Sequence, residues 1–133
     1  MEIETRPLRS LDDAKRLREL VYSAYGLTYH RGFLYHPEQV ISLNARGLLR
    51  STLAFDRQSG EILGHLATIR PFFELSSEED LLTPTSSVEI GLSLVSPNAR
   101  GQSIQGQLAQ RCVALAAAEN PGLTTVFSKC VTA

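Results

Sequence analysis

The segment that most constrains the fold is an apolar stretch followed by a short polar turn and a pattern with helical spacing. The apolar stretch covers residues 88–95, and the helical pattern continues to about Glu119. A strand, a tight turn and a helix in this order predict an anion site. The first turn of a helix has unpaired N–H groups and the positive end of the helix dipole. Small residues here, namely Gly101, Ser103 and Gly106, let a ligand approach the backbone.

Hydrophobic periodicity predicts further strands and helices on both sides of this segment. Ser10 is a plausible N-cap for a first helix that stops at Gly26, and Pro37 suits the start of a second helix that Gly47 ends. The expected helices cover residues 11–25, 36–44 and, after the turn, up to about 119. The expected strands cover residues 3–6, 49–55, 61–69, 88–95 and 124–131. The polar, acidic residues 74–87 are expected to form a connection.

Composition predicts one globular domain over residues 1–133. Hydrophobic residues make up 43% and charged residues 20%, which is ordinary for a folded domain of this length. The net charge of −1 argues against a general nucleic-acid binder or an anionic-membrane binder, and no apolar stretch is long enough to cross a bilayer. We find no secretory signal and expect Cys112 and Cys130 to be reduced thiols of a cytoplasmic protein. The three histidines have no metal-ligand spacing, so we predict no metal.

Residues 95–108 resemble the signature of the GNAT superfamily of acyl-CoA N-acyltransferases. That signature has Arg or Gln, two variable residues, Gly, one variable residue, and Gly or Ala. The matching window is Arg100-Gly101-Gln102-Ser103-Ile104-Gln105, and Val95, Pro97 and Leu108 fit its flanks. Ser103 replaces the first motif Gly, where a serine is a good helix N-cap. Gln105 replaces the second small residue, and it either crowds a pyrophosphate or points away from it.

The resemblance implies an α/β (α+β) fold with a mixed, mostly antiparallel sheet flanked by helices, in the order β-α-α-β-β-β-α-β. Family members normally continue with another helix and two more strands, whereas this sequence ends after the predicted fifth strand. We therefore expect an incomplete domain. It is either the N-terminal portion of a longer protein or a shortened form that completes its sheet by self-association, as in a homodimer.

The function implied by the resemblance is transfer of an acetyl group from acetyl-CoA to a small-molecule or peptide amine, by direct attack in a ternary complex. A backbone N–H near Leu94 or Val95 would polarise the thioester carbonyl. Arg100 adds positive charge, serves only through its backbone, or lies on the surface. The alternative function is a non-catalytic acyl-CoA-binding or regulatory module with a degenerate site. The candidate cofactor-binding residues are Leu94, Val95, Arg100, Gly101, Gln102, Ser103, Ile104, Gln105 and Gly106.

Glu89 is the candidate general base, because an acid on this strand does that work in several family members. An ion pair at the sheet edge is the alternative role. We expect Glu89 to lie on the face of its strand opposite Val88, Ile90, Leu92 and Leu94.

His65, on the third strand, either faces the acceptor groove as a base or is buried and satisfied by its neighbours. Cys130 is either an acyl-accepting thiol or, as buried thiols usually are, inert. An aromatic segment either lines the acceptor site or packs in the core. Its members are Tyr22, Tyr25, Tyr29, His30, Phe33 and Tyr35.

Overall fold

The computed structural model describes residues 2–29, 31–70 and 86–128. Within these residues, five strands form one sheet in the order β1-β2-β3-β4-β5. The strands are β1 (Ile3–Pro7), β2 (Leu49–Asp56), β3 (Ile62–Ile69), β4 (Ser87–Val95) and β5 (Thr125–Phe127). The first three pairings are antiparallel, and β4 and β5 are parallel. The predicted mixed, mostly antiparallel sheet is confirmed.

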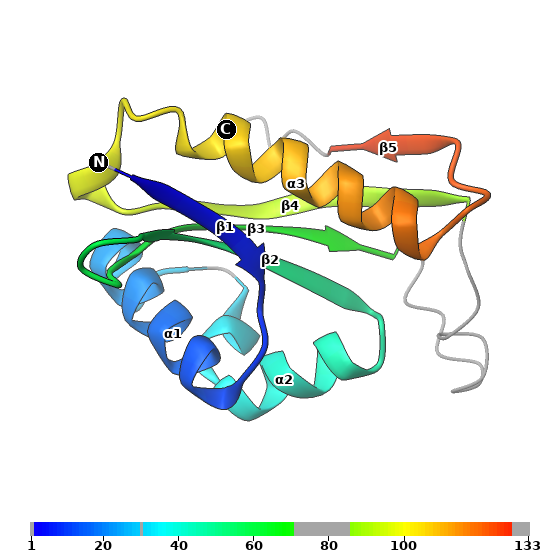
Figure 1. The fold of residues 1–133 in the computed structure, drawn as a ribbon. Coiled ribbons are helices and arrows are strands. Elements are labelled where there is room, and N and C mark those ends of the chain that lie inside the picture. Colours follow the sequence, from blue (N-terminus) through cyan, green and yellow to red (C-terminus); the bar gives the residue numbers. More distant parts are fainter. Residues whose placement is uncertain (1, 30, 71–85, 129–133) are drawn as a thin grey trace.

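The helices divide between the two faces of the sheet, as Figure 1 shows. The first face is covered by α1 (Leu11–Tyr25) and α2 (Pro37–Ala45), and the second by α3 (Ile104–Glu119). Short 3-10 helices, η1 (Gly32–Tyr35) and η3 (Pro97–Ala99), lie in the connections. The buried apolar residues accordingly form one cluster under α1 and α2 and another under α3. No helix in the described ranges is long and apolar enough to cross a membrane.

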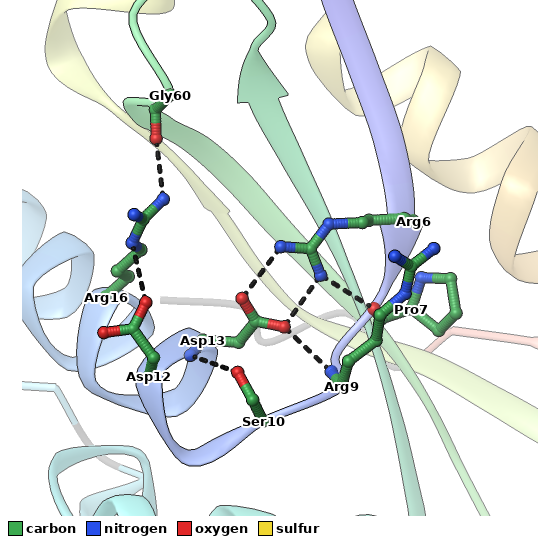
Figure 2. A network of polar contacts seen from close by, with 8 residues as sticks. All are labelled: Arg6, Pro7, Arg9, Ser10, Asp12, Asp13, Arg16 and Gly60. Carbon is green, nitrogen blue, oxygen red and sulfur yellow. Dashed lines mark hydrogen bonds and ion pairs between the residues drawn. The ribbon is translucent and has the colours of Figure 1, made fainter.

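A buried carboxylate anchors the start of α1 to β1 (Figure 2). The two oxygens of Asp13 accept hydrogen bonds from the Arg6 guanidinium at 2.7 and 2.8 Å, and one also accepts from the Arg9 N–H at 2.8 Å. The Arg6 guanidinium stacks on the Phe55 ring, 4.5 Å from its centroid. Burial raises the pKa of Asp13, but the hydrogen bonds from Arg6 and Arg9 outweigh this effect, so the pKa lies below its usual value. Ser10 caps the helix as predicted, because its Oγ accepts from the Asp13 N–H at 3.1 Å.

A β-bulge interrupts β4 next to β3. His65 pairs with Leu94 and Ala67 with Gly91, so Leu92 and Ser93 both lie opposite Leu66. Leu92 has φ 58°, in the left-handed region that residues with a Cβ rarely adopt. One extra residue on one strand, with a local kink, is what defines a bulge.

The bulge reverses which residues of β4 face which helices. Ile90 and Val95 pack with the cluster under α3, whereas Leu92 and Leu94 belong to the cluster under α1 and α2. The prediction that Val88, Ile90, Leu92 and Leu94 share one face is therefore wrong, because strict alternation assumes an unbroken ladder.

The described part of the last strand pairs only with the beginning of β4. The register joins Ser87 to Thr125, Val88 to Val126 and Glu89 to Phe127. The predicted strand covered residues 124–131, of which residues 129–131 lie outside the described residues, as does most of the predicted connection 74–87. Beyond Glu89, β4 continues to Val95 without a described partner residue on its β5 side.

Candidate functional site

The loop between β4 and α3 forms a shallow cleft at the start of the helix, which we call the anion cleft. Its volume is about 430 Å³. Most of the predicted cofactor-binding residues line it, including Arg100, Gly101 and the first residue of α3, Ile104. It is lined by Val95, Ala99, Arg100, Gly101, Ser103, Ile104 and Gln105. The 16-residue helix α3 begins at this cleft, and the unpaired N–H groups of a helix N-terminus suit a phosphate or pyrophosphate.

Three predicted cofactor residues lie elsewhere. Leu94 is 2% exposed in the core under α1 and α2. Gln102 is exposed in the loop, and Gly106 lies in the first turn of α3 with open space where a Cβ would be. The structure therefore brings Val95, Arg100, Gly101, Ser103, Ile104 and Gln105 together, and their binding role stays a prediction.

Ser103 has the backbone conformation of a glycine. It occupies the N-cap position of α3 with φ 59° and ψ 27°, and its side chain makes no capping hydrogen bond. The prediction of a serine side-chain cap is therefore wrong, because a cap needs an extended backbone at that residue. The left-handed conformation explains why the signature has Gly here, and it costs a residue with a Cβ roughly 1–2 kcal/mol.

The Gln105 side chain, on α3, makes a hydrogen bond to the bulge in β4. Its Nε2 donates to the Ser93 Oγ at 2.6 Å. Gln105 thus lines the anion cleft while its amide is held at β4, and its effect on a pyrophosphate stays a prediction. Ser93 was not a predicted site residue, because nothing in the strand pattern marks a bulge.

A second cleft shares one lining residue, Gln105, with the first, and we call it the bulge cleft. Its volume is about 490 Å³, and it lies along β4 past the end of the described β4–β5 pairing. Gly91, Leu92 and Ser93 of the bulge line it. Tyr25 and Tyr29 line it from the end of α1 and the segment that follows, and Ser128 from beyond β5.

Glu89 lies where the bulge cleft meets an apolar branch. The branch has a volume of about 280 Å³, and its lining includes Phe33, Leu43 and Leu49. Glu89 lines both spaces and is only 8% exposed. One of its carboxylate oxygens lies 3.5 Å from where a Cβ on Gly91 would be. Glu89 therefore presents a nearly buried carboxylate to both spaces, and its role as a general base stays a prediction.

His65 does not face either cleft as a free base. It is fully buried, with Nδ1 2.7 Å from the Leu92 carbonyl oxygen and Nε2 2.9 Å from the Ser51 Oγ. Burial lowers the pKa of His65 to about 4, although the hydrogen bond to Leu92 opposes the shift. Of the two roles left open by the sequence, the buried and satisfied one is confirmed.

Packing in the core is confirmed for three members of the aromatic segment, because Tyr29 belongs to the cluster under α1 and α2, and Phe33 and Tyr35 pack against it. Tyr22 and Tyr25 are 44% and 46% exposed, and a role at the acceptor site stays a prediction. Tyr25 and Tyr29 line the bulge cleft, with ring centroids 4.9 Å apart. Burial, with nearby Tyr25, raises the pKa of Tyr29 to about 12. Tyr22 and Tyr35 pack together at 5.2 Å. His30 lies outside the described residues.

Neither cysteine adds a described nucleophile. Cys112 is buried under α3, and burial raises the pKa of its thiol. Cys130 lies outside the described residues. In the part of the chain that the structure describes, no group of three or more His, Cys, Asp or Glu side chains could hold a metal ion.

No protein-family model and no curated protein sequence matches this chain. Solved structures do match it. An acetyltransferase from Trypanosoma brucei is 16% identical over 98% of this chain and 84% of its own, with a TM-score of 0.69. An aminoglycoside antibiotic 6'-N-acetyltransferase from Acinetobacter baumannii is 16% identical over 98% of this chain and 80% of its own, with a TM-score of 0.70.

A GNAT family acetyltransferase from Brucella melitensis, solved in complex with acetyl-CoA, is 22% identical over 88% of this chain and 70% of its own, with a TM-score of 0.62. Similarity at this level of identity shows the fold. The chain has the GNAT fold, so the predicted fold is confirmed.

Proposed function

We propose that this chain binds acetyl-CoA and transfers its acetyl group to an amine. The observation that carries the proposal is that Gln105 lines both the anion cleft and the bulge cleft. In this proposal the pyrophosphate of acetyl-CoA binds in the anion cleft at the start of α3. The thioester and the amine bind in the bulge cleft, beside the kinked part of β4. The solved complex of a structural neighbour with acetyl-CoA supports this assignment.

The reaction that fits this geometry is direct attack. The amine nitrogen forms a bond to the thioester carbonyl carbon, the carbon–sulfur bond breaks, and the CoA thiolate leaves and takes a proton from water. The attacking amine must lose a proton, which Glu89 accepts directly or through one water and passes to solvent. The acceptor is proposed at the level of a small-molecule or peptide amine. Aminoglycoside acetyltransferases among the structural neighbours are in keeping with a small-molecule amine.

Calorimetric titration with acetyl-CoA tests the binding half of this proposal. ADP and acetyl-pantetheine serve as controls, because the first keeps the pyrophosphate and the second lacks it. Saturable binding of acetyl-CoA and ADP, but not of acetyl-pantetheine at equal concentration, supports the anion cleft. No binding by a folded chain overturns the proposal. An acceptor screen that follows release of the CoA thiol then tests the transfer half.

Glu89→Gln should lower kcat at neutral pH by roughly 100-fold or more, because it removes the proton acceptor and keeps the side-chain volume. The affinity for acetyl-CoA should not change. Steady-state kinetics with a good acceptor would measure both. Glu61→Gln, a change at an exposed residue just before β3, is the matched control. Undiminished turnover of Glu89→Gln would remove Glu89 from the mechanism.

Gly101→Glu should weaken binding of acetyl-CoA and ADP by roughly tenfold or more, because it adds a negative charge at the anion cleft. Gly101 has φ 86° and open space where a Cβ would be. Gly101→Ala therefore has the same backbone strain without the charge. Calorimetry at two salt concentrations would separate the effects, since only the charge effect shrinks with added salt. Equal affinities for the two variants would contradict an anion site here.

The second candidate is a non-catalytic acyl-CoA-binding or regulatory module. The hydrogen bond from Gln105 to Ser93 favours it, because this side chain occupies the junction that the pantetheine arm has to pass. Under this alternative the chain binds acetyl-CoA, yet no amine releases the CoA thiol.

Gln105→Ala should tighten acetyl-CoA binding by about fivefold, which corresponds to the roughly 1 kcal/mol of one hydrogen bond no longer displaced. Alanine also matches the signature and is a good helix former. Calorimetry would measure the change, with Gln110→Ala, on an exposed part of the same helix, as the control. Weaker binding would mean that Gln105 contacts the ligand instead of obstructing it.

A further inference from the structure

A chain of buried polar side chains crosses the sheet from α2 to the bulge, and no step of the proposed reaction uses it. Its members are Asn44 at the end of α2, Ser51 on β2 and His65 on β3, and it ends on the carbonyl of Leu92 in β4. All three side chains belong to buried residues, at 8%, 2% and 0% exposure. We call this set the Asn44–His65 chain. Buried polar groups in such a position are retained only when they are satisfied.

The hydrogen-bond partners fix the protonation of the imidazole. A carbonyl oxygen can only accept, so the His65 Nδ1 carries the proton and donates to Leu92 at 2.7 Å. Nε2 is then the acceptor of a hydrogen bond that the Ser51 hydroxyl donates, at 2.9 Å. The Ser51 Oγ in turn faces the Asn44 Nδ2 at 3.4 Å, while the Asn44 Oδ1 accepts the Ser51 N–H at 2.8 Å. Each heteroatom of the imidazole thus has one partner with the correct role.

The Leu92 carbonyl in the bulge requires a hydrogen-bond donor, which His65 Nδ1 supplies. Leu92 has no partner residue in the β3 register, and a buried carbonyl without a partner is costly. Its left-handed backbone costs roughly 1–2 kcal/mol more. Two contacts hold it there, namely the imidazole on its carbonyl and the packing of its side chain, 9% exposed, in the core under α1 and α2.

We propose that His65 is a positioning residue, which holds the Leu92 carbonyl so that Gly91, Leu92 and Ser93 keep the kinked shape that lines the bulge cleft. Since His65 is fully buried, it touches neither acetyl-CoA nor amine and acts only through β4. Its effect on transfer rests on the proposed function, whereas its effect on the shape of β4 does not. The Asn44–His65 chain of hydrogen bonds also connects the kinked part of β4 to the end of α2 through Ser51 and Asn44.

Nuclear magnetic resonance tests the effect on β4 without any ligand. A residue with positive φ gives a strong cross-peak between its own amide and α protons, which an extended residue does not. His65→Leu removes both hydrogen bonds at similar volume, and we expect the Leu92 cross-peak to weaken to that of an extended residue. His65→Gln keeps one donor and one acceptor on a planar amide, and we expect it to retain the cross-peak. An unchanged cross-peak in folded His65→Leu overturns the proposal.

Kinetics tests the consequence for transfer. We expect His65→Leu to lower kcat by roughly ten- to a hundredfold, because small displacements of a positioned reactant cost that much. The affinity for ADP, which needs only the anion cleft, should not change, and His65→Gln should recover most of the rate. Loss of the cross-peak with an unchanged kcat overturns the positioning role. If the wild-type chain transfers no acetyl group, the proposed function fails, and the cross-peak alone decides the proposal.

Ser51→Ala keeps the test decisive if His65→Leu does not fold. This change removes the hydroxyl that is the partner of both Nε2 and the Asn44 Nδ2, but it leaves the hydrogen bond from Nδ1 to Leu92 in place. It should therefore weaken the Leu92 cross-peak and lower kcat by a smaller factor than His65→Leu. Thr52→Val is the matched control, because it removes the next buried hydroxyl of β2, which interacts with Cys112 under α3 instead. Equal behaviour of Ser51→Ala and Thr52→Val overturns the proposal.

Discussion

Gly64→Ala should destabilise the protein by about 3 kcal/mol and move the start of α3 away from the sheet. Gly64 lies on β3 beneath the first turns of this helix. A Cβ there would be 2.8 Å from Ile104 Cγ2, 3.0 Å from the Leu94 carbonyl oxygen and 3.1 Å from Leu108 Cδ1. The Leu94 oxygen belongs to the backbone of the neighbouring strand and cannot rotate away. Overpacking of this kind typically costs 1–3 kcal/mol.

The same change should weaken acetyl-CoA binding, because Ile104 is both the closest contact of the new methyl group and a lining residue of the anion cleft. Urea unfolding and calorimetric titration would measure the two effects. Gly122→Ala is the matched control, because a Cβ at Gly122 meets nothing within 4 Å. A stable Gly64→Ala variant with wild-type affinity would show that the helix and sheet adjust without cost, contrary to the close packing described above.

The strands and helices could be predicted because their apolar residues repeat with the period of each element. The expected helix at residues 11–25 is α1, and the cap by Ser10 and the stop at Gly26 are both present. The strand at residues 88–95 corresponds to β4 to within one residue. Local signals of this kind require no knowledge of the partner strand.

The face of each β4 residue could not be predicted, because a bulge is a property of a strand pair. The sequence Val88 to Val95 alternates as a regular strand does, yet Leu92 adopts a positive φ. The contacts that hold it there are core packing and a hydrogen bond from His65, which lies 27 positions earlier in the chain. The same bulge brings Ser93 within hydrogen-bond distance of Gln105, the residue that replaces a small residue of the signature. This contact also joins two separate elements, so the sequence pattern of either element alone does not predict it.

Acidification from about pH 6.5 to about pH 4 should cost the protein about 3 kcal/mol of unfolding free energy through His65. The pKa of His65 falls from 6.5 to about 4 on folding, because burial disfavours the imidazolium. Below pH 6.5 the unfolded chain therefore binds a proton that the native state does not, and the stability falls as the pH falls. The loss stops near the native pKa. Each unit of pKa difference is worth about 1.4 kcal/mol.

Urea unfolding at several pH values between 7.5 and 4.5 would measure this dependence. Below pH 4 the carboxylate of Asp13, whose pKa is also lowered, adds its own loss, so the chosen range isolates the histidine. His65→Gln removes the titrating group. Between pH 7.5 and pH 4.5, the unfolding free energy of this variant should therefore fall by about 3 kcal/mol less than that of the wild type. Parallel curves for wild type and His65→Gln would mean that His65 takes up a proton in the folded state. Its Nε2 would then no longer accept from Ser51.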